Sequence, residues 1–268
     1  MTRRLATIGL SLAILAGCAG PAGGSAGSGG ASLALTVLAA ASLATPLDQL
    51  RSAWEASRPG VSITVATDSS TALRVQIEQG APADLLLSAD SANPAALAAA
   101  GLTDGAPVPF AGNRLTIIVP DANPASIDEP SDLARAGVRI VAAGREVPLT
   151  GYATRVLNRL ATLPGYRDGF AAACEANVVS REDNARAVVA RVELGEADAG
   201  IVYLSDAVAA DRVTTIPIPD EANVTAVYAG VVVRGARHPQ AARDFLAWIA
   251  GPDGHAILAE LGFTAPPA

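Results

Sequence analysis

The chain has 268 residues, a formal net charge of −7 and 50% hydrophobic residues, which is enough apolar material for one large or two small domains. All 19 cationic residues are arginine, so sites that require a lysine, such as the Walker-A loop and a Schiff-base centre, are excluded. The negative charge argues against a nucleic-acid partner. Two cysteines and two histidines are too few and too scattered for a zinc cage, and no resident metal or cofactor is expected.

The first 32 residues are typical of an export signal followed by a tether. Arg3 and Arg4 precede an apolar stretch at 5–15 that is too short to span a bilayer. Residues 15–18 (LAGC) resemble the lipobox of bacterial lipoproteins. We therefore expect 1–17 to be a signal peptide, Cys18 to carry a lipid, and 18–32, rich in Gly, Ser and Ala, to be a flexible tether. The alternative is an ordinary cleaved signal in which Cys18 is incidental.

Lipidation of Cys18 would place the protein on the outer face of the cytoplasmic membrane, which is the periplasmic side in a cell with two membranes. Cys174 then has no partner for a disulfide within the chain. We expect Cys174 to act as a small buried or half-buried hydrophobic residue, and the alternative is a reactive thiol.

Strands and helices are predicted to alternate from residue 33 onward. The continuous apolar run Leu33–Ala40 predicts a strand that is buried on both faces. Further strands are predicted at 61–66, 84–88, 114–119, 138–142, 199–203 and 225–233. Helices are predicted at 47–56, with Thr45 as N-cap and Pro46 at the first helical position, and at 72–79, 94–100, 152–160, 184–193, 239–249 and 253–261. This alternation predicts an α/β fold with sheets rich in parallel strands.

Small polar residues follow several predicted strands and precede predicted helices. They are Ser42 and the segments 68–71 (DSST), 149–151 (LTG) and 183–185 (DNA). Ligands of α/β sheets bind at the carboxyl ends of the strands, and helix N-termini there offer free N–H groups to anions. Each of these segments alone is typical of an ordinary helix cap, so it is their convergence that indicates a site.

Several blocks of sequence carry a family resemblance. They are 37–43 (VLAAASL), 69–71 (SST), 76–84 (QIEQGAPAD), 88–90 (SAD), 112–115 (GNRL), 147–148 (VP) with 151–153 (GYA), 184–186 (NAR), 195–203 (GEADAGIVY) and 262–263 (GF). In this order and spacing they resemble the periplasmic molybdate-binding proteins, over nearly the whole chain from about residue 33 to 263. The resemblance implies the type II periplasmic-binding fold, in which two α/β lobes enclose a ligand cleft and are joined by two crossover segments. Lobe 1 would comprise 33–112 plus 227–268, and lobe 2 would comprise 113–226.

The same resemblance implies a receptor that is not an enzyme. Such a receptor binds molybdate, and also tungstate, and delivers the anion to the permease of an ABC importer; we expect a monomer. The residues at the family's ligand positions are Ser42, Ser70 and Tyr203, which would donate hydroxyl protons, and Leu149 and Ala185, which would donate backbone N–H groups. Ser69 and Thr150 are additional candidate donors.

Two departures from the family pattern leave the ligand open. Leu149 and Thr150 replace the usual Ala-Gly pair, and Asp68 stands two residues before Ser70. A carboxylate that pointed into the cleft would repel a dianion, so we expect Asp68 to point outward or to cap the helix. The alternatives are a relative tuned to sulfate or phosphate and, more remotely, a secreted serine hydrolase.

A serine hydrolase would need a base near its nucleophile, and the only histidines, His238 and His255, lie far along the chain from both serines. Without the resemblance, Tyr203 would be interpreted as a core aromatic residue. Arg114 and Arg186 are expected in surface or interlobe ion pairs.

Overall fold

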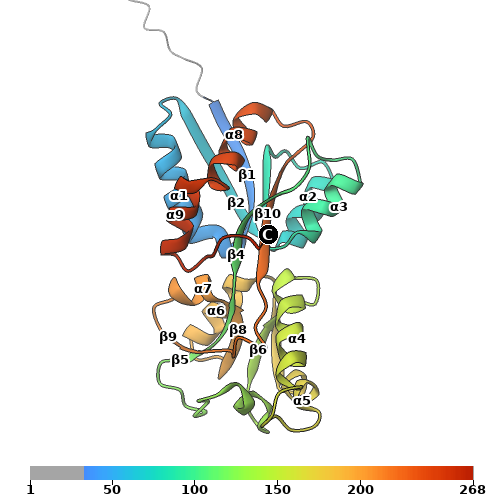
Figure 1. Cartoon of the computed structure of the whole chain (residues 1–268), viewed down its shortest axis with the longest axis vertical. Helices are drawn as coiled ribbons and strands as arrows, with labels where there is room; N and C mark the ends of the chain where they lie inside the picture. Colours follow the sequence, from blue (N-terminus) through green and yellow to red (C-terminus); the bar gives the residue numbers. More distant parts are fainter. Residues whose placement is uncertain (1–32, 268) are drawn as a thin grey trace, which may run out of the picture. The chain divides into compact units, whose positions relative to one another are not determined.

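The computed structural model describes residues 33–267 (Figure 1). The predicted signal peptide, the lipid-bearing Cys18 and the tether at 18–32 lie outside the described residues. No helix within the described part is long and apolar enough to cross a bilayer. The described residues belong to one compact unit, and this unit contains two five-stranded sheets.

The first sheet has the strand order β2-β1-β3-β10-β4. Its strands are β1 (Leu33–Ala40), β2 (Val61–Asp68), β3 (Leu85–Ser88), β4 (Val108–Asn113) and β10 (Ala226–Val232). The first three run parallel, and β10 runs antiparallel to both of its neighbours. β1 pairs with β2 over its whole length, so Ala40 lies opposite Asp68 and the residues after both strands emerge side by side.

Helices cover both faces of the first sheet, as the apolar run in β1 predicts. α1 (Ala44–Ala56), α8 (Pro239–Ile249) and α9 (Pro252–Glu260) pack on the face that carries Val37, and α2 (Ser70–Glu78) and α3 (Ala92–Ala99) pack on the face that carries Leu38 (Figure 1). Val37 and Leu38 therefore belong to two separate clusters of buried side chains. Because both faces are covered, β1 has no polar face.

The second sheet has the order β7-β6-β8-β5-β9. Its strands are β5 (Leu115–Pro120), β6 (Ile140–Ala143), β7 (Val178–Glu182), β8 (Ala199–Tyr203) and β9 (Val213–Ile216). The helices around it are α4 (Pro148–Leu160), α5 (Phe170–Ala176), α6 (Ala185–Glu193) and α7 (Leu204–Val208), and two 3-10 helices, η1 (Ala41–Leu43) and η2 (Pro130–Ala134), complete the fold. β6 runs parallel to β7 and β8, whereas β5 is antiparallel to β8 and β9.

The chain passes from the first sheet to the second at Arg114, between β4 and β5, and returns in the segment 217–225. The lobe boundaries derived from the resemblance stay a prediction, because both sheets belong to one compact unit.

Every predicted strand and helix is present within a few residues, but the predicted start of the first helix is wrong. α1 begins at Ala44 directly after η1, so its N-cap is Leu43 without a side-chain bond, and neither Thr45 nor Pro46 starts the helix. Each sheet contains one reversed strand, β10 in the first and β5 in the second, and its other four strands run in one direction, in agreement with the expected richness in parallel strands. The elements that the pattern did not predict are all at most seven residues long; they are β4, α5, β7, α7, β9 and the two 3-10 helices.

Candidate functional site

A small pocket lies where parallel strands of both sheets end. The residues that line it are Ala40, Ala41, Ser42, Asp68, Ser69, Ser70, Ala89, Val147, Pro148, Asn184, Ala185 and Tyr203. They follow β1, β2 and β3 in the first sheet and β6, β7 and β8 in the second. None of these described residues is cationic, and the single charge among them is the carboxylate of Asp68. A ligand here meets neutral hydrogen-bond donors and helix N-termini from two sides.

Ser42 and Ser70, the two predicted ligand serines, both line this pocket and are both buried. The backbone N–H of Ala89 donates to Oγ of Ser70 at 3.0 Å. Because that bond uses an oxygen lone pair, the hydroxyl proton of Ser70 stays free for another acceptor. Oγ of Ser42 lies 2.9 Å from the hydroxyl oxygen of Tyr228, in a buried hydrogen bond.

Asp68 also lines the pocket, and its carboxylate is engaged next to the start of α2. Its Oδ1 accepts the backbone N–H of Ser69 at 2.7 Å. The N-cap of α2 is Ser69, whose own Oγ accepts the N–H of Ala72 at 3.2 Å. Asp68 therefore does not cap the helix itself, but its charge lies beside the helix N-terminus, where the helix dipole stabilises an anion.

Tyr203 reaches the pocket from the end of β8 in the second sheet. Its side chain is 1% exposed, and its hydroxyl is buried without a hydrogen-bond partner among the described residues. Burial raises the pKa of Tyr203 well above its ordinary value, so the hydroxyl keeps its proton. A buried hydroxyl without a partner is costly, so this group is available to a ligand in the pocket.

Two helices of the second sheet point their N-termini at the same pocket. Asn184 caps α6 by accepting the N–H of Ala187 at 3.0 Å, and Ala185 is the first residue of that helix. α4 begins with Pro148, which has no N–H group, so Leu149 supplies the first N–H of that helix. The N–H groups of the first turn have no partner within the helix and can bind an anion.

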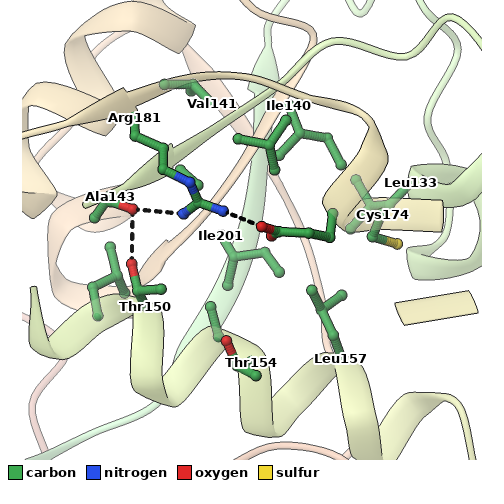
Figure 2. Close-up of a pocket in the computed structure, with 15 residues that line it drawn as sticks. Leu133, Ile140, Val141, Ala143, Thr150, Thr154, Leu157, Cys174, Arg181 and Ile201 are labelled. Carbon is green, nitrogen blue, oxygen red and sulfur yellow. Dashed lines mark hydrogen bonds and ion pairs between the residues drawn. The ribbon is translucent and has the colours of Figure 1, made fainter. Parts of the chain in front are cut away.

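The side chains of Leu149 and Thr150 do not line the pocket. Both line a different, mostly apolar cavity between α4 and the second sheet, and Figure 2 shows Thr150 and Arg181 both bonded to the carbonyl of Ala143. The Thr150 hydroxyl donates to the carbonyls of Ala143 at 2.9 Å and of Gly144 at 2.8 Å. Its proton is therefore used within the second sheet.

Cys174 lines this second cavity as well, where it is buried with a free thiol. Burial raises the pKa of the thiol to about 12. The expectation of a small buried hydrophobic residue is thereby confirmed.

Two hydrogen bonds that the sequence pattern did not indicate join the two sets of elements near the pocket. The hydroxyl of Thr71 in α2 donates to the carbonyl of Glu146, just before α4, at 2.7 Å. The hydroxyl of Tyr152 in α4 accepts the N–H of Val227 in β10 at 3.3 Å. These bonds join elements of the first sheet to elements of the second.

A second polar pocket of about 100 Å³ lies on the other side of Ser42, lined by residues that include Arg186, Glu193 and Asp206. Asp206 stands in α7, and its Oδ2 is buried without a hydrogen-bond partner among the described residues. Burial raises the pKa of this carboxyl to about 7, although the positive charge of Arg186 opposes the shift. Sequence reasoning missed this residue, because a single Asp in a short helix carries no pattern.

Arg114 forms a surface ion pair with Asp220, as expected. Arg186 is exposed and forms no ion pair with a described residue, so the expectation for it is wrong. His255 hydrogen-bonds the carbonyl of Phe110 at 2.8 Å, and His238 precedes α8. Neither histidine lines the pocket that holds the two serines.

Comparison with known proteins supplies the family. The model of a family described as bacterial extracellular solute-binding protein matches residues 35–264. The chain belongs to this family. Its description places its members outside the cytoplasm. The prediction that the chain is not an enzyme is confirmed, because the family and the relatives are named as binding proteins.

The relatives within this family confirm the resemblance stated above. The chain is 37% identical to the molybdate-binding protein ModA of Mycobacterium tuberculosis, over 87% of this chain and 85% of the relative. It is 30% identical to ModA of Escherichia coli, over 86% of this chain and 88% of the relative.

Solved structures confirm the predicted type II periplasmic-binding fold. The periplasmic molybdate-binding protein of Azotobacter vinelandii matches with a TM-score of 0.74 and 25% identity, over 87% of this chain and all of that chain. The sulfate-binding protein SubI of M. tuberculosis matches with a TM-score of 0.76 over 86% of each chain, but at 21% identity that likeness shows the fold alone.

Proposed function

We propose that this chain is an extracytoplasmic receptor that binds molybdate, and also tungstate, in the pocket between the two sheets and delivers the anion to the permease of an ABC importer. The ModA relatives support the ligand, since they are named for molybdate. The observation that carries the proposal is the buried hydroxyl of Tyr203, which lacks a partner among the described residues in a pocket lined by other neutral donors.

The proposed donors come from both sheets. The hydroxyls of Ser42 and Ser70 bind the anion from the first sheet, and the hydroxyl of Tyr203 binds it from the second. The backbone N–H groups of Leu149 and Ala185 add the N-termini of α4 and α6. The burial of the Leu149 side chain elsewhere is compatible with this role, because only its N–H group is required. Ser69 lines the pocket and stays a candidate donor, whereas the Thr150 hydroxyl is directed away from it.

Neutral donors suit a carrier that must release its cargo. Hydrogen bonds to a charged acceptor are about twice as strong as neutral ones, so several of them can hold a dianion without a cationic side chain. The nearby carboxylate of Asp68 opposes binding and limits the affinity. Molybdate and tungstate would be selected over the smaller sulfate ion by the spacing of the donors, because all three ions accept hydrogen bonds in the same way.

We propose further that residues 1–17 are removed, that Cys18 carries the lipid anchor and that the protein acts as a monomer with no cofactor. Mass spectrometry of the mature N-terminus tests the lipid, and Cys18→Ala should release the protein from the membrane fraction. Light scattering of the unliganded protein at several concentrations tests the monomer.

Calorimetric titration of the purified protein with molybdate, tungstate, sulfate and phosphate tests the ligand. We expect one-to-one binding of the first two anions and no heat from the others. Binding of sulfate instead would assign the chain to a smaller tetrahedral anion. Binding of phosphate would indicate that Asp68 accepts the proton that hydrogen phosphate carries. No binding of any of the four anions would contradict the proposal.

A further inference from the structure

The hydrogen bond between Ser42 and Tyr228 connects a proposed anion donor to a residue that does not line the pocket. The two oxygens lie 2.9 Å apart although the residues are 186 positions apart in the chain. Tyr228 stands in β10 with a side chain that is 0% exposed. Its ring meets Phe110, Tyr203 and Phe263 edge-on, at centroid separations of 5.3 to 6.2 Å. This packing fixes the place of the hydroxyl.

Either oxygen of this pair can be the donor, and only one arrangement serves an anion. If Ser42 donates to Tyr228, the serine has no proton left for the pocket. The proton of Tyr228 must then find another acceptor. If Tyr228 donates to Ser42, the serine proton is free to point at the anion.

Ser70 shows what this second arrangement achieves. Its oxygen accepts from the N–H of Ala89, a group that can only donate, so its proton is directed elsewhere by default. Ser42 is bonded instead to the hydroxyl of Tyr228, which can either donate or accept, so the direction of this hydrogen bond depends on what occupies the pocket. A dianion selects the arrangement in which both protons point toward it, and a chain of two hydrogen bonds in one direction polarises the second donor.

We propose that Tyr228 is a positioning residue that donates to Ser42 and thereby commits the Ser42 hydroxyl to the bound anion. The inference rests on the proposed function, since it requires an anion at Ser42. Tyr228 itself does not touch the ligand.

The test is a double-mutant cycle with Tyr228→Phe and Ser42→Ala, measured as the dissociation constant for molybdate. Tyr228→Phe keeps the buried ring and removes only the hydroxyl. We expect it to weaken binding roughly three- to ten-fold, the range of one net hydrogen bond. In the Ser42→Ala background the same substitution should have no further effect, because the hydroxyl acts through Ser42. Tyr166→Phe is the matched control, since Tyr166 packs on Phe170 and does not line the pocket.

Unchanged or tighter binding by Tyr228→Phe overturns the inference, as does an effect that adds fully to that of Ser42→Ala. If Ser42→Ala itself binds like the parent, or the parent binds no molybdate, the proposed function has failed instead. A merely structural role would lower the melting temperature of the unliganded variant without coupling to Ser42.

A measurement on the unaltered protein avoids any dependence on the folding of the variants. The chain has four tyrosines. With the Cζ carbons of these residues labelled with ¹³C, saturation with molybdate should shift the Tyr228 resonance as well as that of Tyr203. A Tyr228 resonance that does not move overturns the inference.

Discussion

Replacing Tyr203 by Phe separates a ligand group from a structural one, because the two roles predict opposite signs. The hydroxyl is buried and has no partner among the described residues, and such a group costs about 1–3 kcal/mol in the folded protein. Its removal should therefore leave the melting temperature of the unliganded protein unchanged or raise it by a few degrees. A hydrogen bond to a charged ligand contributes about 1.5–3 kcal/mol. The dissociation constant for molybdate should then rise about 10- to 150-fold.

Scanning calorimetry of the unliganded variant and isothermal titration with molybdate measure the two effects on one sample. Tyr166→Phe is the control, because it removes a hydroxyl outside the pocket. It should change the melting temperature by no more than about a degree or two and leave the affinity for molybdate unchanged. A Tyr203→Phe variant that melts lower and binds as well as the parent would refute the reasoning, since its hydroxyl would then have a structural partner and no ligand.

Three further predictions concern other groups. Ser70→Ala should raise the molybdate dissociation constant at least tenfold by titration calorimetry, because the Ala89 N–H leaves the Ser70 proton free for the anion; an unchanged constant would remove Ser70 from the site. Asp68→Asn should tighten molybdate binding, most strongly at low ionic strength, since it keeps an oxygen for the Ser69 N–H and removes a like charge; weaker binding would contradict the repulsion. Burial raises the pKa of Asp206 to about 7 in the folded protein. In the unfolded chain the same carboxyl has its ordinary pKa near 4, so between these two pH values the folded state holds a proton that the unfolded chain has released. The free energy of unfolding should therefore fall by up to roughly 4 kcal/mol as pH rises from 4 to 7. Urea titrations of the parent and of Asp206→Asn at pH 5 and pH 8 test this, and the variant should lose most of the fall. An equal fall in both proteins would contradict the assignment of this pH dependence to Asp206.

The sequence pattern located the strands that matter for the pocket, and the reason is physical. β1 and β8 are continuous runs of mostly apolar residues, a pattern that can be recognised in the sequence without knowledge of distant contacts. Both strands were predicted with their observed bounds. Because parallel strands in one sheet end at the same edge, the residues that follow β1 and β2 could be expected to converge. Tyr203 follows β8 in the other sheet, so its place beside them was implied by the family resemblance alone. Ser42, Ser70 and Tyr203 do line one pocket in the structure.

Other features depend on contacts that no local pattern carries. The bond between Ser42 and Tyr228 joins residues 186 positions apart, and the bond between Thr71 and Glu146 joins residues 75 apart. β9 has four residues and α7 has five, which is too short for a period to stand out. The direction of the Thr150 side chain was also unpredictable, because it depends on the carbonyls of Ala143 and Gly144 at the end of β6.

In the proposed site the donors come from both sheets, so anion binding would be coupled to the contacts between the sheets. Ser42 and Ser70 belong to the first set of elements, and Ala185 and Tyr203 to the second, so neither set alone can surround an anion. A contact such as the Thr71 hydroxyl on the Glu146 carbonyl forms only when the two sets meet, whether or not a ligand is present. It therefore raises the fraction of molecules that are ready to bind, and the apparent dissociation constant is inversely proportional to that fraction. Affinity in such a receptor is determined by residues beyond the pocket as well as by the groups that touch the anion.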